Sequence, residues 1–275
     1  MSQRYFEEAP LATTYAMVRP EPPASLVQRV LDYLRGGYGG PLEAALDVGC
    51  GSGQSTHSLA PHFVSVTGLD ISEAQVAEAL KLNKNPAVAF RVSGAESLPF
   101  PDGSQQLVTA GQACHWFDLP RFFKEVDRVL VPGGVVALYC YDVERIVHHR
   151  LAEKLNAAID EVYHEVLAGC WGQGIKDVED MYQDPRFALA YPDSCRDETH
   201  LLEREVSVVE VTLMIASLSG FNTYREKNGE PAAQKVLDDF QKKFMSTLGV
   251  TSPPEDTRIK VCNKFLLILG RKPSA

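Results

Sequence analysis

Apolar and polar positions alternate along the middle of the chain with two periods, one typical of buried strands and one typical of helices. Short apolar runs bounded by turn residues predict five strands, over Ala44–Val48, Val64–Asp70, Val88–Val92, Leu107–Ala110 and Val135–Tyr141. Apolar residues at helical spacing predict three helices between them, over Gln54–Phe63, Ser72–Asn83 and Asp118–Leu130. This alternation of strands and helices predicts an α/β fold, in which a parallel sheet has helices on both faces.

The region before this core carries one more amphipathic pattern. Leucines and valines at helical spacing predict a helix over Ala24–Arg35. The glycine-rich stretch at residues 35–41 then separates this helix from the first strand. We therefore expect residues 1–41 to form an N-terminal segment that contains one helix.

The region after the fifth strand loses the regular alternation. One helix is expected at about Arg150–Leu167, and a turn-rich stretch follows it. Together they predict a helical and loop cap inserted after strand five, over residues 142–202. The strand pattern returns at about 205–211, a helix is expected to start near Pro231, and Lys264–Leu269 predicts a last strand.

Length, charge and cysteine spacing limit the possible partners. Neither a repeat nor a low-complexity linker divides the chain, so we predict a single domain over residues 1–275. Asp and Glu number 36 against 27 Lys and Arg, and the net charge of −9 repels nucleic acid and anionic lipid. No apolar run could span a membrane, and the first residues carry no apolar signal segment. The six cysteines lack the spacing of a metal or redox pair.

From these features we expect a cytoplasmic protein with reduced cysteines and no bound metal. We expect neither a nucleic-acid partner nor a membrane partner. The sequence does not indicate an oligomeric state.

The stretch LDVGCGSGQ at residues 46–54 places Gly49, Gly51 and Gly53 directly after the first predicted strand. A strand, a glycine loop and a helix N-terminus bring backbone close to a cofactor. A dinucleotide fingerprint needs another glycine where Gln54 stands, and a P-loop needs a Gly-Lys-Ser/Thr run that is absent here. Asp47 would repel a pyrophosphate at this place, and it suits a ligand that carries an ammonium group.

Asp70 ends the second predicted strand, at the same edge of the sheet as the glycine loop. A carboxylate at this position can accept hydrogen bonds from both hydroxyls of a ribose. The loop, Asp47 and Asp70 together fit S-adenosylmethionine, which has an ammonium group and a ribose but no phosphate. Each acid taken alone is explained as well by a capping or surface role.

These motifs, with GLDIS, GAESLPFPDGS, ACHWFD and RVLVPGG further along, give the chain a resemblance to the class I S-adenosylmethionine-dependent methyltransferases. Within that class it resembles the ubiquinone-biosynthesis-type and trans-aconitate-methyltransferase-like group. The resemblance covers roughly residues 44–141. It implies a Rossmann-like, doubly wound, mostly parallel sheet of seven strands, of which the last, here Lys264–Leu269, is antiparallel.

The resemblance also implies which positions would hold the cofactor. The loop residues would hold the methionine part, Asp70 would bind the ribose, and later positions would contact the adenine or pass beneath the methionine part. Carried over position by position, the cofactor residues are Asp47, Gly49, Cys50, Gly51, Gly53, Asp70, Ile71, Ala95, Glu96, Gln112 and Ala113. Gly94 stands where many relatives have an aspartate, so Glu96 or backbone atoms would bind the adenine amino group.

His115 follows the fourth predicted strand and is the candidate general base, with the fixing of a turn as the alternative. The resemblance favours a role in lining the site over a role as the base. The candidates for substrate binding are polar or aromatic side chains on strand five, in the cap and in segments expected to close over the site. They are Arg19, Tyr139, Tyr141, Trp171, Asn222, Tyr224 and Arg225. Each of them can also be explained by packing within the fold, so the sequence leaves their roles open.

We therefore predict S-adenosylmethionine-dependent methyl transfer to a small molecule. The lack of a convincing base fits O-methylation of an organic acid, because a carboxylate is ionised at neutral pH. Arg19 and Arg225 would supply the cation that such a substrate needs. A protein methyltransferase and a cofactor-binding partner protein without activity remain alternatives. A nicotinamide oxidoreductase is disfavoured by Asp47 and Gln54.

Overall fold

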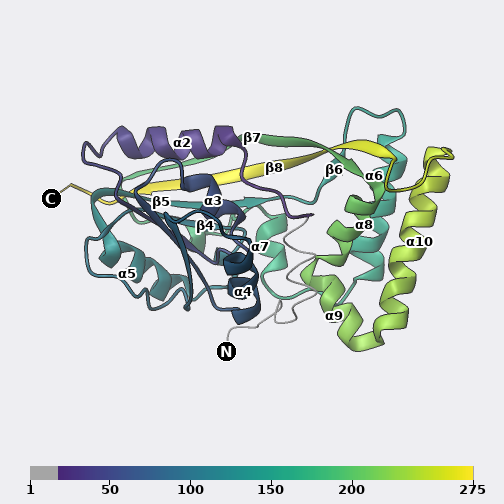
Figure 1. Cartoon of the computed structure of the whole chain (residues 1–275), viewed down its shortest axis with the longest axis horizontal. Coiled ribbons are helices and arrows are strands. Elements are labelled where there is room, and N and C mark those ends of the chain that lie inside the picture. Colours follow the sequence, from purple (N-terminus) through teal and green to yellow (C-terminus); the bar gives the residue numbers. More distant parts are fainter. Residues whose placement is uncertain (1–17, 275) are drawn as a thin grey trace.

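The computed structural model describes residues 18–274, which form a sheet with helices on both faces and a helical cap at one end (Figure 1). The sheet has eight strands in the order β3-β2-β1-β4-β5-β8-β6, with β7 also paired to β8. The five parallel strands are β1 (Ala44–Val48), β2 (Ser65–Asp70), β3 (Val88–Val92), β4 (Gln105–Gly111) and β5 (Leu130–Tyr141).

The remaining strands complete one side of the sheet. β8 (Arg258–Arg271) is antiparallel to β5, as the resemblance implied for the last strand. β7 (Asp193–Ser207) is antiparallel to β8 and runs beside it over almost its whole length. β6 (Arg145–Ile146) is a two-residue strand paired with β8. Seven long strands with one reversed confirm the predicted Rossmann-like, doubly wound fold.

Helices cover both faces of the sheet, because alternate side chains of each buried strand point to opposite faces. One face carries α2 (Ala24–Arg35), α3 (Gln54–Leu59) and α4 (Glu73–Leu82). The other carries α5 (Leu119–Val129) and the short helices η1 (Cys114–Trp116), α7 (Ile175–Glu179) and η3 (Pro185–Phe187). Both faces have a continuous apolar core, which holds the carboxyl ends of the strands in place.

Helix starts follow local capping chemistry. The Ser72 hydroxyl accepts a hydrogen bond from the Gln75 amide at the start of α4. The Asp118 carboxylate does the same for the Arg121 amide at the start of α5. Such caps satisfy amides that a helix leaves unpaired in its first turn, and both starts were predicted from these residues.

The cap is built from two segments that are far apart in the sequence. The first supplies α6 (Ala152–Asp160) and the π-helix η2 (Glu161–Val166), where one helix over Arg150–Leu167 was expected. The second supplies α8 (Val208–Ala216), α9 (Ser219–Asn228) and α10 (Glu230–Leu248). Their apolar faces pack together into a third core, which the ends of β7 and β8 enter.

Two expectations about this region differ from the structure. The strand expected at about 205–211 ends at Ser207, because Ser207 and Glu210 form a capping box that starts α8 at Val208. This local cap prevails over the β-branched residues that follow it. The cap expected over residues 142–202 also has different limits, since 193–202 lie in β7 and residues 208–248 join the cap.

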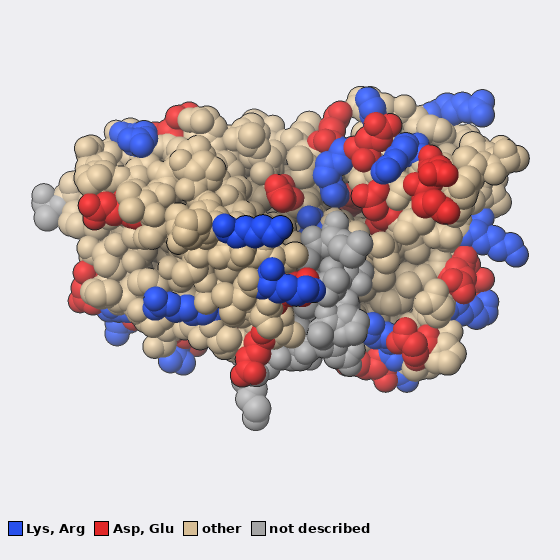
Figure 2. All heavy atoms as spheres, in the orientation of Figure 1, with Lys and Arg blue, Asp and Glu red and all other residues tan. Residues whose placement is uncertain are grey.

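Charged residues are dispersed over the surface. Figure 2 shows basic and acidic side chains interspersed on one face of the molecule, without a continuous basic patch on that face. Within residues 18–274, no helix is both long and apolar enough to cross a membrane.

Candidate functional site

The glycine loop between β1 and α3 has a backbone that other residues adopt poorly. Gly49, Gly51 and Gly53 all have left-handed φ angles, of 72°, 54° and 98°. A Cβ atom at Gly49 would lie 2.4 Å from the Cβ of Ala113, and one at Gly53 would lie 2.6 Å from Cζ of Phe90. The loop therefore makes the tight turn expected from the sequence, and it packs closely against Ala113 and Phe90.

Asp47 lies beneath this loop and is wholly buried. Its carboxylate accepts hydrogen bonds from the hydroxyls of Ser55 at 2.6 Å, Thr56 at 2.7 Å and Thr109 at 2.8 Å. Burial raises the pKa of this carboxyl, and the three hydroxyls act in the opposite direction. In this arrangement Asp47 ties the first turn of α3 to β1 and β4. Its carboxylate thus supports the loop from below, where direct contact with an ammonium group had been expected.

Asp70 ends β2 beside the loop, and it is only partly buried. Its two carboxylate oxygens accept hydrogen bonds from the Gly51 amide at 2.8 Å and the Ser72 amide at 2.9 Å. The carboxylate is thereby held at the rim of the loop, next to the partly buried Ile71. This is the position from which a ribose could be bound.

The expected adenine positions lie one strand further along. Ala95 is buried in the core on the α5 face, so its backbone rather than its methyl group is available there. Glu96 is partly buried, and its carboxylate accepts a hydrogen bond from the Asp118 amide at 3.0 Å. Glu96 therefore joins the segment after β3 to the start of α5.

Gln112 follows β4 and connects the loop to β5. Its φ of 52° is left-handed. Its side chain accepts a hydrogen bond from the Tyr141 amide at 2.9 Å and donates one to the Tyr141 carbonyl at 3.3 Å. Ala113 is buried directly against Gly49. The two residues thus fix the distance between the glycine loop and the end of β5.

The described residues line two cavities at this edge of the sheet. The first, here called the loop cavity, has its walls on the glycine loop, the ends of β4 and β5 and the segment before α2. It is lined by Arg19, Pro20, Pro22, Gly49, Cys50, Gln54, Ser55, Gly111, Gln112, Tyr139 and Tyr141. Gly111 makes room for Tyr139, since a Cβ there would lie 2.4 Å from the tyrosine ring.

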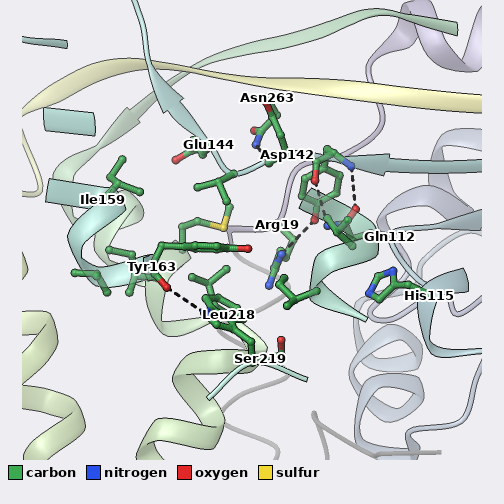
Figure 3. A pocket seen from close by; sticks show the side chains of 18 of the residues that line it. Arg19, Gln112, His115, Asp142, Glu144, Ile159, Tyr163, Leu218, Ser219 and Asn263 are labelled. Carbon is green, nitrogen blue, oxygen red and sulfur yellow. Dashed lines mark hydrogen bonds between the residues drawn. The ribbon is translucent and has the colours of Figure 1, made fainter. Parts of the chain in front are cut away.

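The second, here called the cap cavity, lies between the sheet and the cap (Figure 3). Its volume is about 960 Å³, open solvent at its mouth included. Most of its wall is apolar, from Trp116, Val143, Ile159, Val162, Ile175, Val178, Val211, Met214, Ile215 and Leu218. Asp142, Glu144 and Asn263 form a polar stretch of wall. Arg19, Gln112 and Tyr141 line both cavities, so the two meet there.

Arg19 crosses from the segment before α2 to the cap. Its guanidinium donates to the Ser217 carbonyl at 2.8 Å and to the Tyr141 hydroxyl at 3.4 Å. One bond reaches the end of α8 and the other the end of β5. These contacts hold a positive charge where the two cavities meet.

Trp171 is fixed as part of the cap-cavity wall. Its indole Nε1 donates to the Tyr163 carbonyl at 3.0 Å, within the π-helix η2, and the two rings lie 4.3 Å apart. Gly220 on α9 makes room for it, because a Cβ there would lie 2.6 Å from the indole ring. Trp171 and Tyr163 both line the cap cavity.

His115 also lines the cap cavity, and its Nδ1 lies 2.7 Å from the hydroxyl of the buried Tyr182. Burial, with the nearby positive charges of Arg186 and Arg19, lowers the pKa of His115 to about 3. At neutral pH the imidazole is therefore uncharged. A general base works best with a pKa near the operating pH, so this environment makes His115 a weak one.

Three of the sequence candidates lie elsewhere. Asn222 is buried within α9, and Arg225 lies 3.8 Å from the carboxylate of Glu230. Neither these two nor Tyr224 is among the described residues that line the two cavities. Within the described part of the chain, Arg225 therefore does not line either cavity, and its role as a cation for the substrate stays a prediction.

Sequence reasoning missed the polar wall of the cap cavity. Asp142 and Glu144 directly follow β5, and polar residues just after a buried strand are a signal that could have identified them. Burial raises the pKa of both carboxyls. Asn263 lies within β8 and has no comparable signal in the sequence. Among the described residues, no three His, Cys, Asp or Glu side chains are grouped as a metal would require.

Comparisons with known proteins agree with this geometry. Residues 46–138 match the family model described as a methyltransferase domain. A Dictyostelium discoideum protein provisionally named a methyltransferase is 29% identical over 75% of this chain and 76% of its own. The malonyl-[acyl-carrier protein] O-methyltransferase of Hahella chejuensis is 26% identical over 72% of this chain and 69% of its own.

A solved structure is similar over nearly the whole length. It is a provisionally named type II methyltransferase from Anaeromyxobacter dehalogenans, 28% identical, with a TM-score of 0.72. The match covers 94% of this chain and 99% of that one, so it includes the cap as well as the sheet. Fold, family match and relatives together identify the chain as a methyltransferase of the S-adenosylmethionine-dependent class.

Proposed function

We propose that this methyltransferase binds S-adenosylmethionine along the glycine loop and transfers its methyl group to a small molecule held in the cap cavity. The observation that carries the proposal is the junction of the two cavities at Arg19, Gln112 and Tyr141. A cofactor in one cavity and an acceptor in the other would meet there. The more specific likeness to the ubiquinone-biosynthesis-type and trans-aconitate-type group remains part of the proposal.

The residues of the loop fit this cofactor. Gly49 and Gly53 have left-handed backbone and pack the loop closely against Ala113 and Phe90, and Asp70 holds a carboxylate at the rim of the loop. Gly51 and Cys50 would contact the methionine part through their backbone, with Gln112 and Ala113 beneath it. Asp70 would bind the ribose, while Ile71, Ala95 and Glu96 would surround the adenine. When bound, the cofactor supplies an activated methyl group.

Catalysis would depend mainly on positioning. Holding two reacting groups in line can contribute about 7–11 kcal/mol to lowering a barrier. Tyr139 and Tyr141 would form the wall behind the reacting groups, and Trp171 with the apolar cap residues would exclude water.

The acceptor we propose is an organic acid that is methylated on oxygen. A carboxylate needs no base, which agrees with the low pKa of His115. Arg19 would orient the carboxylate at the junction, since a guanidinium pairs well with a planar anion. No separate proton transfer is then required.

Two alternatives stay open. A protein methyltransferase would need to bring a side chain into the cap cavity, whose walls include the cap helices α6 and α8. A cofactor-binding partner protein without activity would bind the cofactor and transfer nothing. The mostly apolar walls of the cavity between sheet and cap favour a small molecule over both.

Calorimetry with S-adenosylhomocysteine tests the cofactor site. We expect the wild-type protein to bind it and to show no comparable binding of NAD. Asp70→Ala should weaken binding at least tenfold, because hydrogen bonds to a charged acceptor contribute about 1.5–3 kcal/mol each. Asp239→Ala, an exposed acid on α10 paired with Lys235, serves as the matched control and should have no effect.

An unchanged dissociation constant in Asp70→Ala would remove Asp70 from the site. Preferential binding of NAD would overturn the proposed cofactor. If S-adenosylhomocysteine binds but labelled methyl groups reach only proteins, the alternative of a protein methyltransferase is correct.

A further inference from the structure

We infer that the acceptor is a monocarboxylic acid with an extended apolar body, and not a small polyacid. This inference rests on the proposed function, and it narrows the acceptor from organic acids in general to one class. Three properties of the cap cavity support it. They are its apolar walls, the sign and position of its charged side chains, and the direction in which the cavity extends from the junction with the loop cavity.

The walls furthest from the glycine loop are apolar. Ile159, Val211 and Ile215 are buried residues of the third core whose side chains reach the cavity. Met214 and Leu218 add flexible, partly buried apolar surface on the same side. An acceptor gains affinity here by covering apolar area, which each added methylene group of a chain would do. A short acid with several carboxylates offers fewer such groups, and each of them lies next to a charged carboxylate.

The charges of the cavity favour one anionic group and disfavour a second. Arg19 is the only Lys or Arg among the described residues that line it. Its hydrogen bonds to Ser217 and Tyr141 hold the positive charge of the guanidinium at the junction. The other charged side chains of the wall are the carboxylates of Asp142 and Glu144.

The carboxylates of Asp142 and Glu144 each interact with a neighbouring group of the protein. Glu144 forms an ion pair with Arg204, and Asp142 accepts a hydrogen bond from the Lys264 amide at 2.8 Å. A second carboxylate on the acceptor would therefore lie beside like charge or against apolar residues. Both placements cost free energy in a buried site. Only the end of the acceptor near Arg19 can be anionic without this cost.

The arrangement in space gives the acceptor its direction. In Figure 3, Gln112 lies on one side of the cavity and Ile159 on the opposite side, with Arg19 between Gln112 and Tyr163. A carboxylate at Arg19 is at the junction with the loop cavity, where the methyl group would arrive. The apolar body of the acceptor would then extend toward Ile159 and the cap.

The experiment compares straight-chain acids that differ only in length or in a second carboxylate. We would measure transfer of labelled methyl from S-adenosylmethionine to butanoate, hexanoate, octanoate and decanoate, and to decanedioate as the matched diacid. Calorimetry of decanoate binding in the presence of S-adenosylhomocysteine provides a readout independent of turnover. We expect kcat/KM to rise about fourfold with each buried methylene group, and decanedioate to be at least tenfold worse than decanoate.

Variants test the two ends of the cavity separately. Arg19→Gln should lower kcat/KM for decanoate at least tenfold, and Arg19→Lys should recover part of the loss. Met214→Trp should fill the apolar end and shift the preference toward hexanoate. Arg258→Gln, an exposed arginine paired with Glu210, is the matched control and should leave both properties unchanged. Circular dichroism of each variant separates loss of fold from loss of the contact.

Several outcomes would overturn the inference. They are a preference for butanoate or decanedioate over decanoate, transfer only to neutral amines, alcohols or thiols, and no transfer to any acid of the series. If S-adenosylhomocysteine still binds in any of these cases, the proposed cofactor site stands and only the inference about the acceptor is wrong. If S-adenosylhomocysteine itself does not bind, the proposed function fails first, and the two failures are thereby distinguished.

Discussion

The glycine loop and the cap cavity lie side by side, but the chain builds them in different ways. The loop comes from one continuous stretch, and its atoms are fixed by left-handed glycines and by hydrogen bonds to Asp47 and Asp70. The cap cavity collects residues from Arg19 to Asn263, most of them apolar side chains on separate elements. The glycine loop is thus formed mainly by backbone atoms, and the cap cavity is formed mainly by side chains.

This difference predicts how the glycine loop and the cap cavity each respond to amino-acid substitutions. Backbone geometry that only glycine adopts cannot be approximated by another residue, so substitutions in the loop should have large effects. Apolar walls tolerate swaps that conserve volume and respond gradually to changes of shape. A protein built in this way can keep its cofactor while its acceptor specificity changes.

The largest expected effect is that of Gly49→Ala. The new methyl group would meet Ala113 at 2.4 Å, on a residue whose φ of 72° already disfavours a side chain. We expect at least a hundredfold loss of affinity for S-adenosylhomocysteine by calorimetry, with a lower melting temperature. Relief of the clash with Ala113 would require the glycine loop to move away from its present position.

Gly103→Ala is the matched control for this prediction. Gly103 also has a left-handed φ, of 59°, but nothing lies within 4 Å of its Cβ position. The Gly103→Ala variant should be somewhat less stable than the wild type and should keep full affinity for S-adenosylhomocysteine. If Gly49→Ala and Gly103→Ala lost affinity equally, the loss would come from general destabilisation of the protein and not from the change in the glycine loop.

A smaller effect is expected on the cap side, from Gly220→Val. The added side chain would displace the Trp171 indole, which lies 2.6 Å from the Cβ position. We expect the KM of the acceptor to rise about tenfold while the dissociation constant of S-adenosylhomocysteine stays within twofold. Steady-state kinetics and calorimetry measure the two quantities separately. A parallel loss of cofactor affinity would mean that the two sides are not independent.

The smallest effect is expected from His115→Asn. General acid–base catalysis contributes about 10²–10⁴-fold, so a drop in kcat of less than fivefold would mean that His115 is not the base. The pH profile of kcat should then be the same in wild type and variant between pH 6 and 8. A loss of more than a hundredfold, with a changed profile, would restore His115 as the base and contradict the carboxylate acceptor.

His115 should also affect stability in acid. Its pKa is about 3 in the folded protein and 6.5 ordinarily, so the unfolded chain binds the extra proton between these values. The free energy of unfolding should therefore fall as the pH drops from about 6.5 toward 3. Urea unfolding should show a weaker fall in His115→Asn over the same window.

The sequence predicted the sheet and the loop well, because both are encoded locally. The apolar runs of β1 to β5 and the caps at Ser72 and Asp118 depend on residues within one or two turns of chain. The cap was predicted only in part. The helices expected at about Arg150–Leu167 and near Pro231 correspond to α6 with η2 and to α10, whereas α8 and α9 were missed. These two helices are held by packing against α10, which in turn packs against α6 from a distant segment. The β-branched residues after Ser207 led to the prediction of a strand there, although the Ser207 capping box starts α8 at this point in the structure.

The candidate site shows the same division. The positions around Asp47, Gly49 and Asp70 follow from one motif, although the burial of Asp47 under three hydroxyls did not. For the cap cavity, Arg19 and Trp171 were named and lie there, whereas Arg225 pairs with Glu230 instead. Which of several arginines faces a cavity depends on contacts between distant segments, and no single stretch of sequence records them.

The pairing of β7 with β8 has a consequence for engineering. Ser207 and Arg258 are register partners, so residues 208–257 leave the sheet and return to it at neighbouring points. The three helices α8 to α10 are therefore an exchangeable module with closely spaced ends. A segment from a related protein could be grafted between the same two positions without lengthening any connection or disturbing the strands. An exchange of this segment would change part of the cap-cavity wall in one step, while the sheet and the glycine loop would stay the same.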